Sequence, residues 1–168
     1  TLNSQALALN LGNFDDVRAE SMIKSAKIAL EHHIPCILDL VGVACSPLRM
    51  QYAKKLLLEA KTTVIKGNIS ECKAFYGLTH GVDADILDIE DVYESAKWLM
   101  DLSRSTGCIV VCSGKTDIIT DGEKAVCIRN GCEIMGCLTG TGCMLNVAIA
   151  TFLACEDAFD ACVDATCY

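Results

Sequence analysis

Short apolar runs alternate along the chain with longer segments in which apolar residues recur every three or four positions. The apolar runs cover residues 6–11, 36–41, 63–66 and 108–112. Runs of this length, bounded by glycine, proline and polar residues, predict strands that are buried on both faces of a sheet. The longer segments predict helices that pack against that sheet.

Helical periodicity marks five segments of the sequence. They cover residues 15–33, 47–61, a short stretch from 70, 89–105, and a last helix that follows the loop at 139–143 and ends near 155. In the first segment Met22, Ala26, Ala29 and Leu30 form the expected apolar face. Pro47 suits a first helical turn, and residues 77–88 are predicted to form a loop.

Strands that alternate with helices predict a parallel sheet covered by helices, which is the α/β class. Residues 117–120 and 124–129 flank Asp121-Gly122, a pair that favours an antiparallel hairpin. We therefore expect a three-layer α/β/α architecture, with a mostly parallel central sheet plus one antiparallel hairpin. Residues 1–168 are expected to form one domain.

Composition narrows the class of protein. The 168 residues are 52% hydrophobic and 21% charged, as in ordinary globular domains. No apolar stretch is long enough for a membrane span and no secretory leader opens the chain, so a cytoplasmic protein is expected. The net charge of −8 argues against a broad nucleic-acid-binding surface.

Twelve cysteines stand out in a chain of this length. None forms a C-x-x-C pair, which disfavours zinc, iron–sulfur and thioredoxin-like sites. Cys36, Cys108, Cys112 and Cys155 lie in apolar runs, where cysteine packs as a small hydrophobic residue. Reduced, mostly structural thiols are the favoured interpretation, and a redox or metal-binding protein is a weaker alternative.

Polar residues follow the predicted strands at their carboxyl ends. They are Asp39, Lys66, Asn68, Glu71 and Ser113. The carboxyl ends of parallel strands share one edge, where ligands of such sheets gather, so these side chains are expected to converge. Each has a structural alternative, such as a buried carboxylate that caps a neighbouring loop for Asp39 or a helix cap for Asn68 with Glu71. Five such residues on one edge favour a functional site.

A glycine-rich loop, Thr-Gly-Thr-Gly-Cys at 139–143, leads into the last apolar helix. Taken alone it is an ordinary turn into a helix. The free amides and the dipole of a helix N-terminus nevertheless stabilise phosphate or developing negative charge. Acidic residues for magnesium, a lysine and such an N-terminus are the parts that phosphoryl transfer requires. The sequence lacks a Walker A lysine motif and protein-kinase signatures.

Four motifs occur in a fixed order: Asp39-Leu40-Val41-Gly42-Val43, Lys66-Gly67-Asn68-Ile69-Ser70-Glu71, Ser113-Gly114-Lys115-Thr116-Asp117 and Thr139-Gly140-Thr141-Gly142-Cys143. Their order and spacing resemble the hydroxyethylthiazole kinase family, within the ribokinase-like superfamily. The chain resembles a member that lacks the N-terminal and C-terminal parts of the domain. The terminal cysteine of the loop is the sharpest point of resemblance, because related sugar and vitamin kinases usually carry aspartate there.

The resemblance implies ATP-dependent phosphorylation of the primary alcohol of 4-methyl-5-(2-hydroxyethyl)thiazole, a salvage step toward thiamine. It also implies a homotrimer, with no nucleic-acid or membrane partner. The implied roles are ATP contacts from Lys66, Ser113 and Asn68, Mg²⁺ held through water by Asp39 and Glu71, a substrate contact from Gly140, and a catalytic group of Thr141, Gly142 and Cys143. Cys143 is expected to orient the alcohol and to accept its proton late.

Departures from the family pattern keep two other functions open. Leu40 replaces a usual proline, Lys66 a usual arginine and Ser113 a usual threonine. A kinase for a hydroxymethylpyrimidine or pyridoxal-type substrate is the nearest rival, although Cys143 disfavours it. A catalytically silent nucleotide-binding module is the alternative from a different class.

Overall fold

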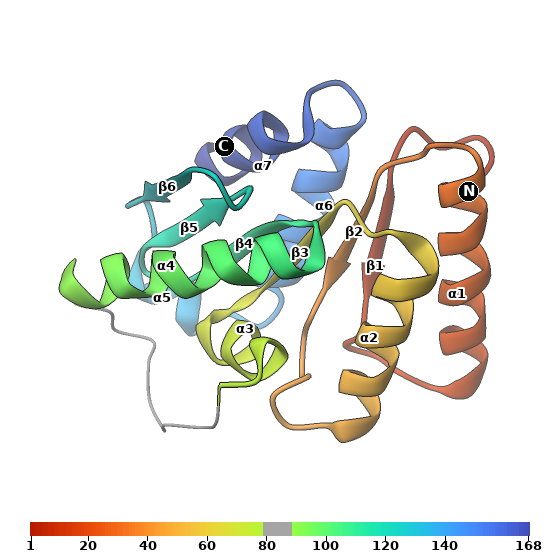
Figure 1. Cartoon of the computed structure of the whole chain (residues 1–168), viewed down its shortest axis with the longest axis horizontal. Helices are drawn as coiled ribbons and strands as arrows, with labels where there is room; N and C mark the ends of the chain where they lie inside the picture. Colours follow the sequence, from red (N-terminus) through yellow and green to blue (C-terminus); the bar gives the residue numbers. More distant parts are fainter. Residues whose placement is uncertain (79–88) are drawn as a thin grey trace.

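The computed structural model describes residues 1–78 and 89–168, and within them it has one six-stranded sheet (Figure 1). The strands are β1 (Leu7–Asn10), β2 (Cys36–Asp39), β3 (Val64–Asn68), β4 (Ile109–Ser113), β5 (Asp117–Thr120) and β6 (Ala125–Ile128). They lie side by side in the order of the sequence. β1 to β4 are parallel, and β5 and β6 add as an antiparallel hairpin. The predicted fold class and the hairpin are confirmed.

The helices are α1 (Asp16–Glu31), α2 (Pro47–Ala60), α3 (Ile69–Tyr76), α4 (Ile89–Thr106), α5 (Glu133–Gly136), α6 (Thr141–Leu153) and α7 (Ala158–Cys167). α1 to α4 connect the parallel strands. Crossovers between parallel strands are right-handed, so strands laid down in sequence order place all their connecting helices on one face of the sheet. Figure 1 shows α6 and α7 on the opposite face, which completes the three layers.

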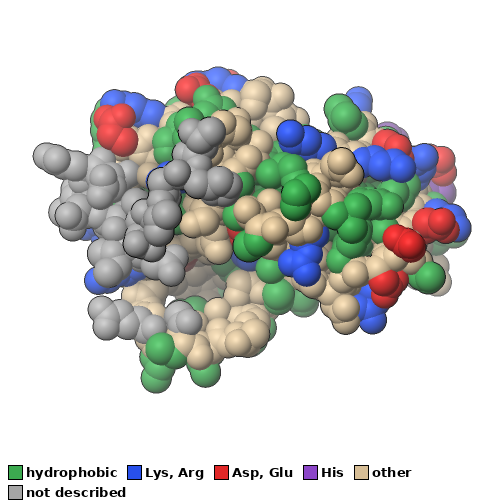
Figure 2. Space-filling view, turned by 90° about the horizontal axis from the view of Figure 1, so that it is seen from below, with side chains coloured by type: hydrophobic (Ala, Val, Ile, Leu, Met, Phe, Trp, Pro, Cys, Tyr) green, Lys and Arg blue, Asp and Glu red, His purple; other side chains and the backbone are tan. Residues whose placement is uncertain are grey.

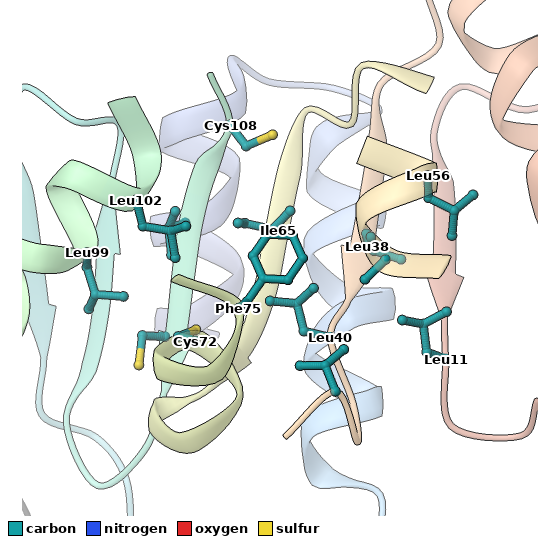
Figure 3. Close-up of a cluster of buried hydrophobic side chains, with 14 of the residues drawn as sticks. Leu11, Leu38, Leu40, Leu56, Ile65, Cys72, Phe75, Leu99, Leu102 and Cys108 are labelled. Atoms are coloured by element: carbon teal, nitrogen blue, oxygen red, sulfur yellow. The ribbon is translucent and has the colours of Figure 1, made fainter. Parts of the chain in front are cut away.

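Side chains of the central strands alternate between two hydrophobic cores. Leu38, Ile65, Val110 and Ile118 face the core beneath α1 to α4. Their neighbours face a second core beneath α6 and α7; they are Ile37, Val64, Val111 and Ile119. Strands that are covered on both faces explain the unbroken apolar runs of the sequence. Figure 3 shows the first core, where Phe75 of α3 and Leu99 of α4 point toward the sheet.

Local sequence signals fix where several helices begin. The side chain of Asp15 caps α1 by accepting a hydrogen bond from the backbone N–H of Arg18. Ser46 caps α2, and Pro47 occupies its first turn as expected. The side chain of Asn68 accepts from the backbone N–H of Glu71, whose carboxylate in turn accepts from the backbone N–H of Asn68, forming a capping box.

Some sequence-based expectations were wrong or fall outside the described structure. Leu30 is expected on the apolar face of α1, but it is 38% exposed. The buried face of α1 is formed by Ala19, Ala26 and Ala29, and Leu30 lies beside this face. Cys155 was grouped with the buried thiols, yet it lies in the exposed turn between α6 and α7. The last predicted element was α6, whereas α7 follows it and packs Phe159 and Cys162 into the second core. Of the predicted loop at 77–88, residues 79–88 lie outside the described residues.

No helix in the described parts of the chain is both long and apolar enough to cross a bilayer.

Candidate functional site

The carboxyl ends of β1 to β4 form one edge of the sheet, at the bottom of Figure 1. Figure 2 looks directly onto this edge, where the surface is hollowed and most acidic side chains lie toward the margins. Residues at the strand ends are placed by the register: Asn10 lies opposite Asp39, Asp39 opposite Lys66, and Asn68 opposite Ser113. The predicted convergence of the strand-end residues is therefore a property of the parallel pairing.

Asp39 and Lys66 form a buried ion pair in the middle of this edge. Lys66 Nζ lies 3.2 Å from Asp39 Oδ2, and the two side chains are 3% and 2% exposed. Burial raises the pKa of the Asp39 carboxyl, and the ammonium of Lys66 opposes that rise. Lys66 is therefore a buried cation at the strand end.

The second carboxylate, Glu71, holds two loops of the edge in place. Its Oε1 accepts from the backbone N–H of Gly42 at 2.8 Å, and its Oε2 accepts from that of Asn68 at 2.9 Å. Arg49 packs against Gly42 and donates from Nη2 to the carbonyl of Gly12 at 2.8 Å. These contacts join the loops that follow β1, β2 and β3. Asn68 and Glu71 thus have the capping role that was the structural alternative for them.

The edge offers oxygen atoms suited to a hard divalent cation. Asp39 Oδ1 is buried and accepts no hydrogen bond from the described residues. Each oxygen of Glu71 uses one acceptor site on the backbone and retains another. Residues 1–78 and 89–168 contain no group of three or more His, Cys, Asp or Glu side chains arranged for a metal. This donor set fits Mg²⁺, which keeps several waters and binds through one or two carboxylates together with phosphate oxygens.

The glycine-rich loop meets this edge from the opposite face of the sheet. Gly140 precedes α6 with φ of 102°, a left-handed conformation that favours glycine, and no side chain caps the helix. A methyl group at Gly142 would lie 3.1 Å from Lys66 Nζ, so the first turn of α6 lies directly against the buried ammonium. Asn146 anchors the same helix by donating to the Leu9 carbonyl at 3.2 Å. The uncapped α6 N-terminus beside the Lys66 ammonium offers free backbone amides to which an anion could bind.

Ser113 and Asp117 border the site on the β4 side. Ser113 Oγ donates to the Gly67 carbonyl at 3.4 Å, and Asp117 Oδ1 accepts from the backbone N–H of Gly114 at 2.8 Å. Burial raises the pKa of the Asp117 carboxyl, while the Gly114 N–H and the charge of Lys66 oppose this. The turn after β4 is thus held closed by Asp117.

Comparison with known proteins assigns the chain. The sequence profile of the hydroxyethylthiazole kinase family matches residues 2–168. The chain belongs to the hydroxyethylthiazole kinase family. Among its relatives, hydroxyethylthiazole kinase 2 of Clostridium botulinum strain Hall is 43% identical over 166 residues, which are 95% of this chain and 63% of that protein. Hydroxyethylthiazole kinase of Thermoanaerobacter sp. strain X514 is 41% identical, with 96% and 62% coverage. The chain therefore spans slightly less than two thirds of the relatives that it matches.

Solved structures agree with the family assignment. A hydroxyethylthiazole kinase protein from Pyrococcus horikoshii OT3 superposes with a TM-score of 0.85 at 29% identity, over 96% of this chain and 59% of that one. Bacillus subtilis pyridoxal kinase, solved as an ADP complex, superposes with a TM-score of 0.66 at 21% identity, over 95% and 61% of the two chains. The second likeness extends to the fold alone.

One polar residue at the strand-end edge of the sheet, Asn10, was not among the predicted site residues. Asn10 ends β1 and donates from Nδ2 to Asp39 Oδ2 at 3.1 Å and to Cys143 Sγ at 3.2 Å. It was counted within the apolar run 6–11, although the end of a parallel strand is where a polar residue signals a site. Cys143 is exposed on the first turn of α6, and within the described parts of the chain its sulfur is linked to the ion pair by Asn10.

Proposed function

We propose that this chain carries the catalytic edge of an ATP-dependent kinase that phosphorylates the primary alcohol of 4-methyl-5-(2-hydroxyethyl)thiazole. The observation that carries the proposal is the contact of the α6 N-terminus with the buried Lys66 ammonium. Asn10 links the same ion pair to the Cys143 thiol by hydrogen bonds. Family membership supplies the substrate. We also propose that residues 1–168 belong to one kinase domain, which works in the cytoplasm as a homotrimer.

Phosphoryl transfer depends mainly on positioning and on charge stabilisation, and the edge provides both. In this proposal Lys66 and the backbone amides of Thr141, Gly142 and Cys143 face the oxygens of the transferred phosphoryl group. Ser113 and Asn68 line the nucleotide side, and Gly140 lies against the thiazole. Cys143 orients the hydroxyl and accepts its proton late in the transfer. Asp39 and Glu71 would hold Mg²⁺ through water, and the ion would neutralise charge on the phosphates.

The proposed activity is tested by incubating the purified protein with ATP, magnesium and the thiazole alcohol, and by separating any phosphorylated alcohol. Parallel reactions contain hydroxymethylpyrimidine or pyridoxal in place of the thiazole. Thiazole phosphate as the main product is the expected result. Product from the pyrimidine or pyridoxal alone would select the rival kinase, and tight ATP binding without any product would select the silent module.

Replacing Cys143 with serine is expected to lower kcat by roughly tenfold or more and to change the pH profile of kcat, because the proton acceptor is a thiolate and a serine hydroxyl does not form the corresponding anion near neutral pH. The matched control is Cys155→Ser, which alters another exposed cysteine, on the turn between α6 and α7. Steady-state kinetics of both variants across a pH series make the comparison. Full activity and an unchanged profile in Cys143→Ser would remove Cys143 from proton transfer.

A further inference from the structure

Asn10 connects three parts of the site that come from distant segments of the chain. It ends the edge strand β1, its register partner Asp39 ends β2, and Cys143 lies 133 residues further along the chain, on α6. The hydrogen bonds of the Asn10 side chain therefore cross both the strand boundary and the boundary between the sheet and the helix layer. No other side chain among the described residues hydrogen-bonds to Cys143 Sγ.

The orientation of the Asn10 amide is fixed by its own hydrogen bonds. Oδ1 accepts from the backbone N–H of Gly12 at 2.8 Å, which assigns the oxygen and nitrogen ends of the amide. Both N–H groups of Nδ2 then point at acceptors, one at Asp39 Oδ2 and the other at Cys143 Sγ. A side chain whose oxygen and both amide hydrogens are all engaged has little rotational freedom.

The same Asp39 oxygen that accepts from Asn10 also accepts from Lys66 Nζ. One carboxylate oxygen thus sets the positions of both the amide that contacts the thiol and the ammonium that lies against Gly142. A shift of Asp39 or Asn10 would move Cys143 relative to Lys66. Reacting groups misplaced by about 1 Å can lose a factor of roughly 100 in rate.

We propose that Asn10 is the positioning residue of the reaction, which holds Cys143 Sγ in register with the Asp39–Lys66 pair. This inference rests on the proposed kinase function for its kinetic consequences, although the contact itself does not. Because Asn10 donates to Cys143 Sγ, a lone pair of the sulfur points toward the strand-end edge of the sheet. The thiol and the ammonium are thereby kept in one rigid frame.

The contact is tested first by NMR, without catalysis. The side-chain amide signals of Asn10 are assigned in the intact protein and compared with those of Cys143→Ala and of the control Cys155→Ala. The Asn10 amide signals should move in Cys143→Ala and stay in place in Cys155→Ala. Unchanged signals in Cys143→Ala would overturn the proposal, whether or not the protein is a kinase.

Kinetics then separate positioning from a merely structural role. Asn10→Ala should lower kcat by about tenfold while the KM for ATP stays within about twofold. On a Cys143→Ala background the same replacement should cost less than about twofold, because residues that act through one another are not additive. An equal loss in both backgrounds would show that Asn10 only stabilises the end of β1, and would refute the proposal. Absence of thiazole phosphorylation by the unaltered protein would reject the kinase function and leave the NMR result to decide on Asn10.

Discussion

Replacing Lys66 with methionine is expected to destabilise the protein by roughly 3–5 kcal/mol near neutral pH, because it leaves Asp39 as a buried charge without its partner. Asp39 is 1% exposed and already feels the negative charge of Glu71. The free energy of unfolding is measured by urea denaturation. Lys97→Met is the matched control, since Lys97 pairs with Glu94 on the exposed face of α4. A loss in Lys66→Met no larger than in this control would contradict the role of Lys66 as a counter-ion.

The dependence of the free energy of unfolding on pH in Lys66→Met is a second test of the Asp39–Lys66 pair. Burial raises the pKa of Asp39 above its unfolded value, and Lys66 opposes the rise, so removal of Lys66 raises this pKa further. The folded variant therefore binds the proton of Asp39 more tightly than the unfolded chain does. Its stability is best at acidic pH and falls as the pH rises through the folded pKa of Asp39.

A double variant separates stability from function at this pair. Lys66→Met with Asp39→Asn removes both charges, so most of the stability lost in Lys66→Met should return. ATP binding should not return, because the ammonium that faces the phosphates is still missing. We expect the KM for ATP to rise by about tenfold or more in Lys66→Ala as well as in the double variant, as when a charge-assisted contact is lost. An unaltered KM in Lys66→Ala would remove Lys66 from the nucleotide site.

The buried thiols are expected to make the protein strongly sensitive to alkali. Burial raises the pKa of Cys36 and Cys162 to about 12 and that of Cys108 to about 11, from 9.0. Between these values the unfolded chain loses thiol protons that the folded protein keeps, so stability is retained below about pH 9 and falls as the pH rises. Three such thiols together remove about 4 kcal/mol between about pH 8 and pH 10.

Urea denaturation under reducing conditions, repeated at increasing alkaline pH, measures this loss. Cys162→Ala should reduce the slope of unfolding free energy against pH by roughly 1 kcal/mol per pH unit, whereas Cys155→Ala, which alters an exposed thiol, should leave the slope unchanged. Equal slopes in the two variants would show that the buried Cys162 thiol does not set the alkaline limit. The cysteine to alanine replacement itself lowers stability at all pH values, so only the slope is compared.

Much of the sheet was predictable because its physical causes are local. Ile37 and Leu38 face two different cores, and a strand covered on both faces must be apolar at successive positions, which the sequence displays directly. Asp39 stood out as a charge inside such a run, and Lys66 as a charge that ends one. The caps at Asp15 and Ser46 are equally local.

What escaped prediction depends on residues far apart in the sequence. Asn10 gains its significance from Cys143, and nothing near residue 10 indicates that contact. Nor does local sequence show that Lys66 would be buried beneath Gly142, since that follows from the docking of α6 on the sheet. α7 was a different failure, because Asp157 as a cap and apolar residues at helical spacing after it were present in the sequence.

The docking of α6 also sets the order in which the site is completed as the protein is made. The four parallel strands and their helices follow one another in sequence and in space, so they can assemble progressively from the N-terminus. Asn10 must nevertheless wait for Cys143, which is made 133 residues later, and Leu9 for Asn146, which is made 137 residues later. Local opening of α6 would likewise dismantle the site while the sheet stays folded. The Asn10 end of β1 thus becomes functional only after α6 has docked.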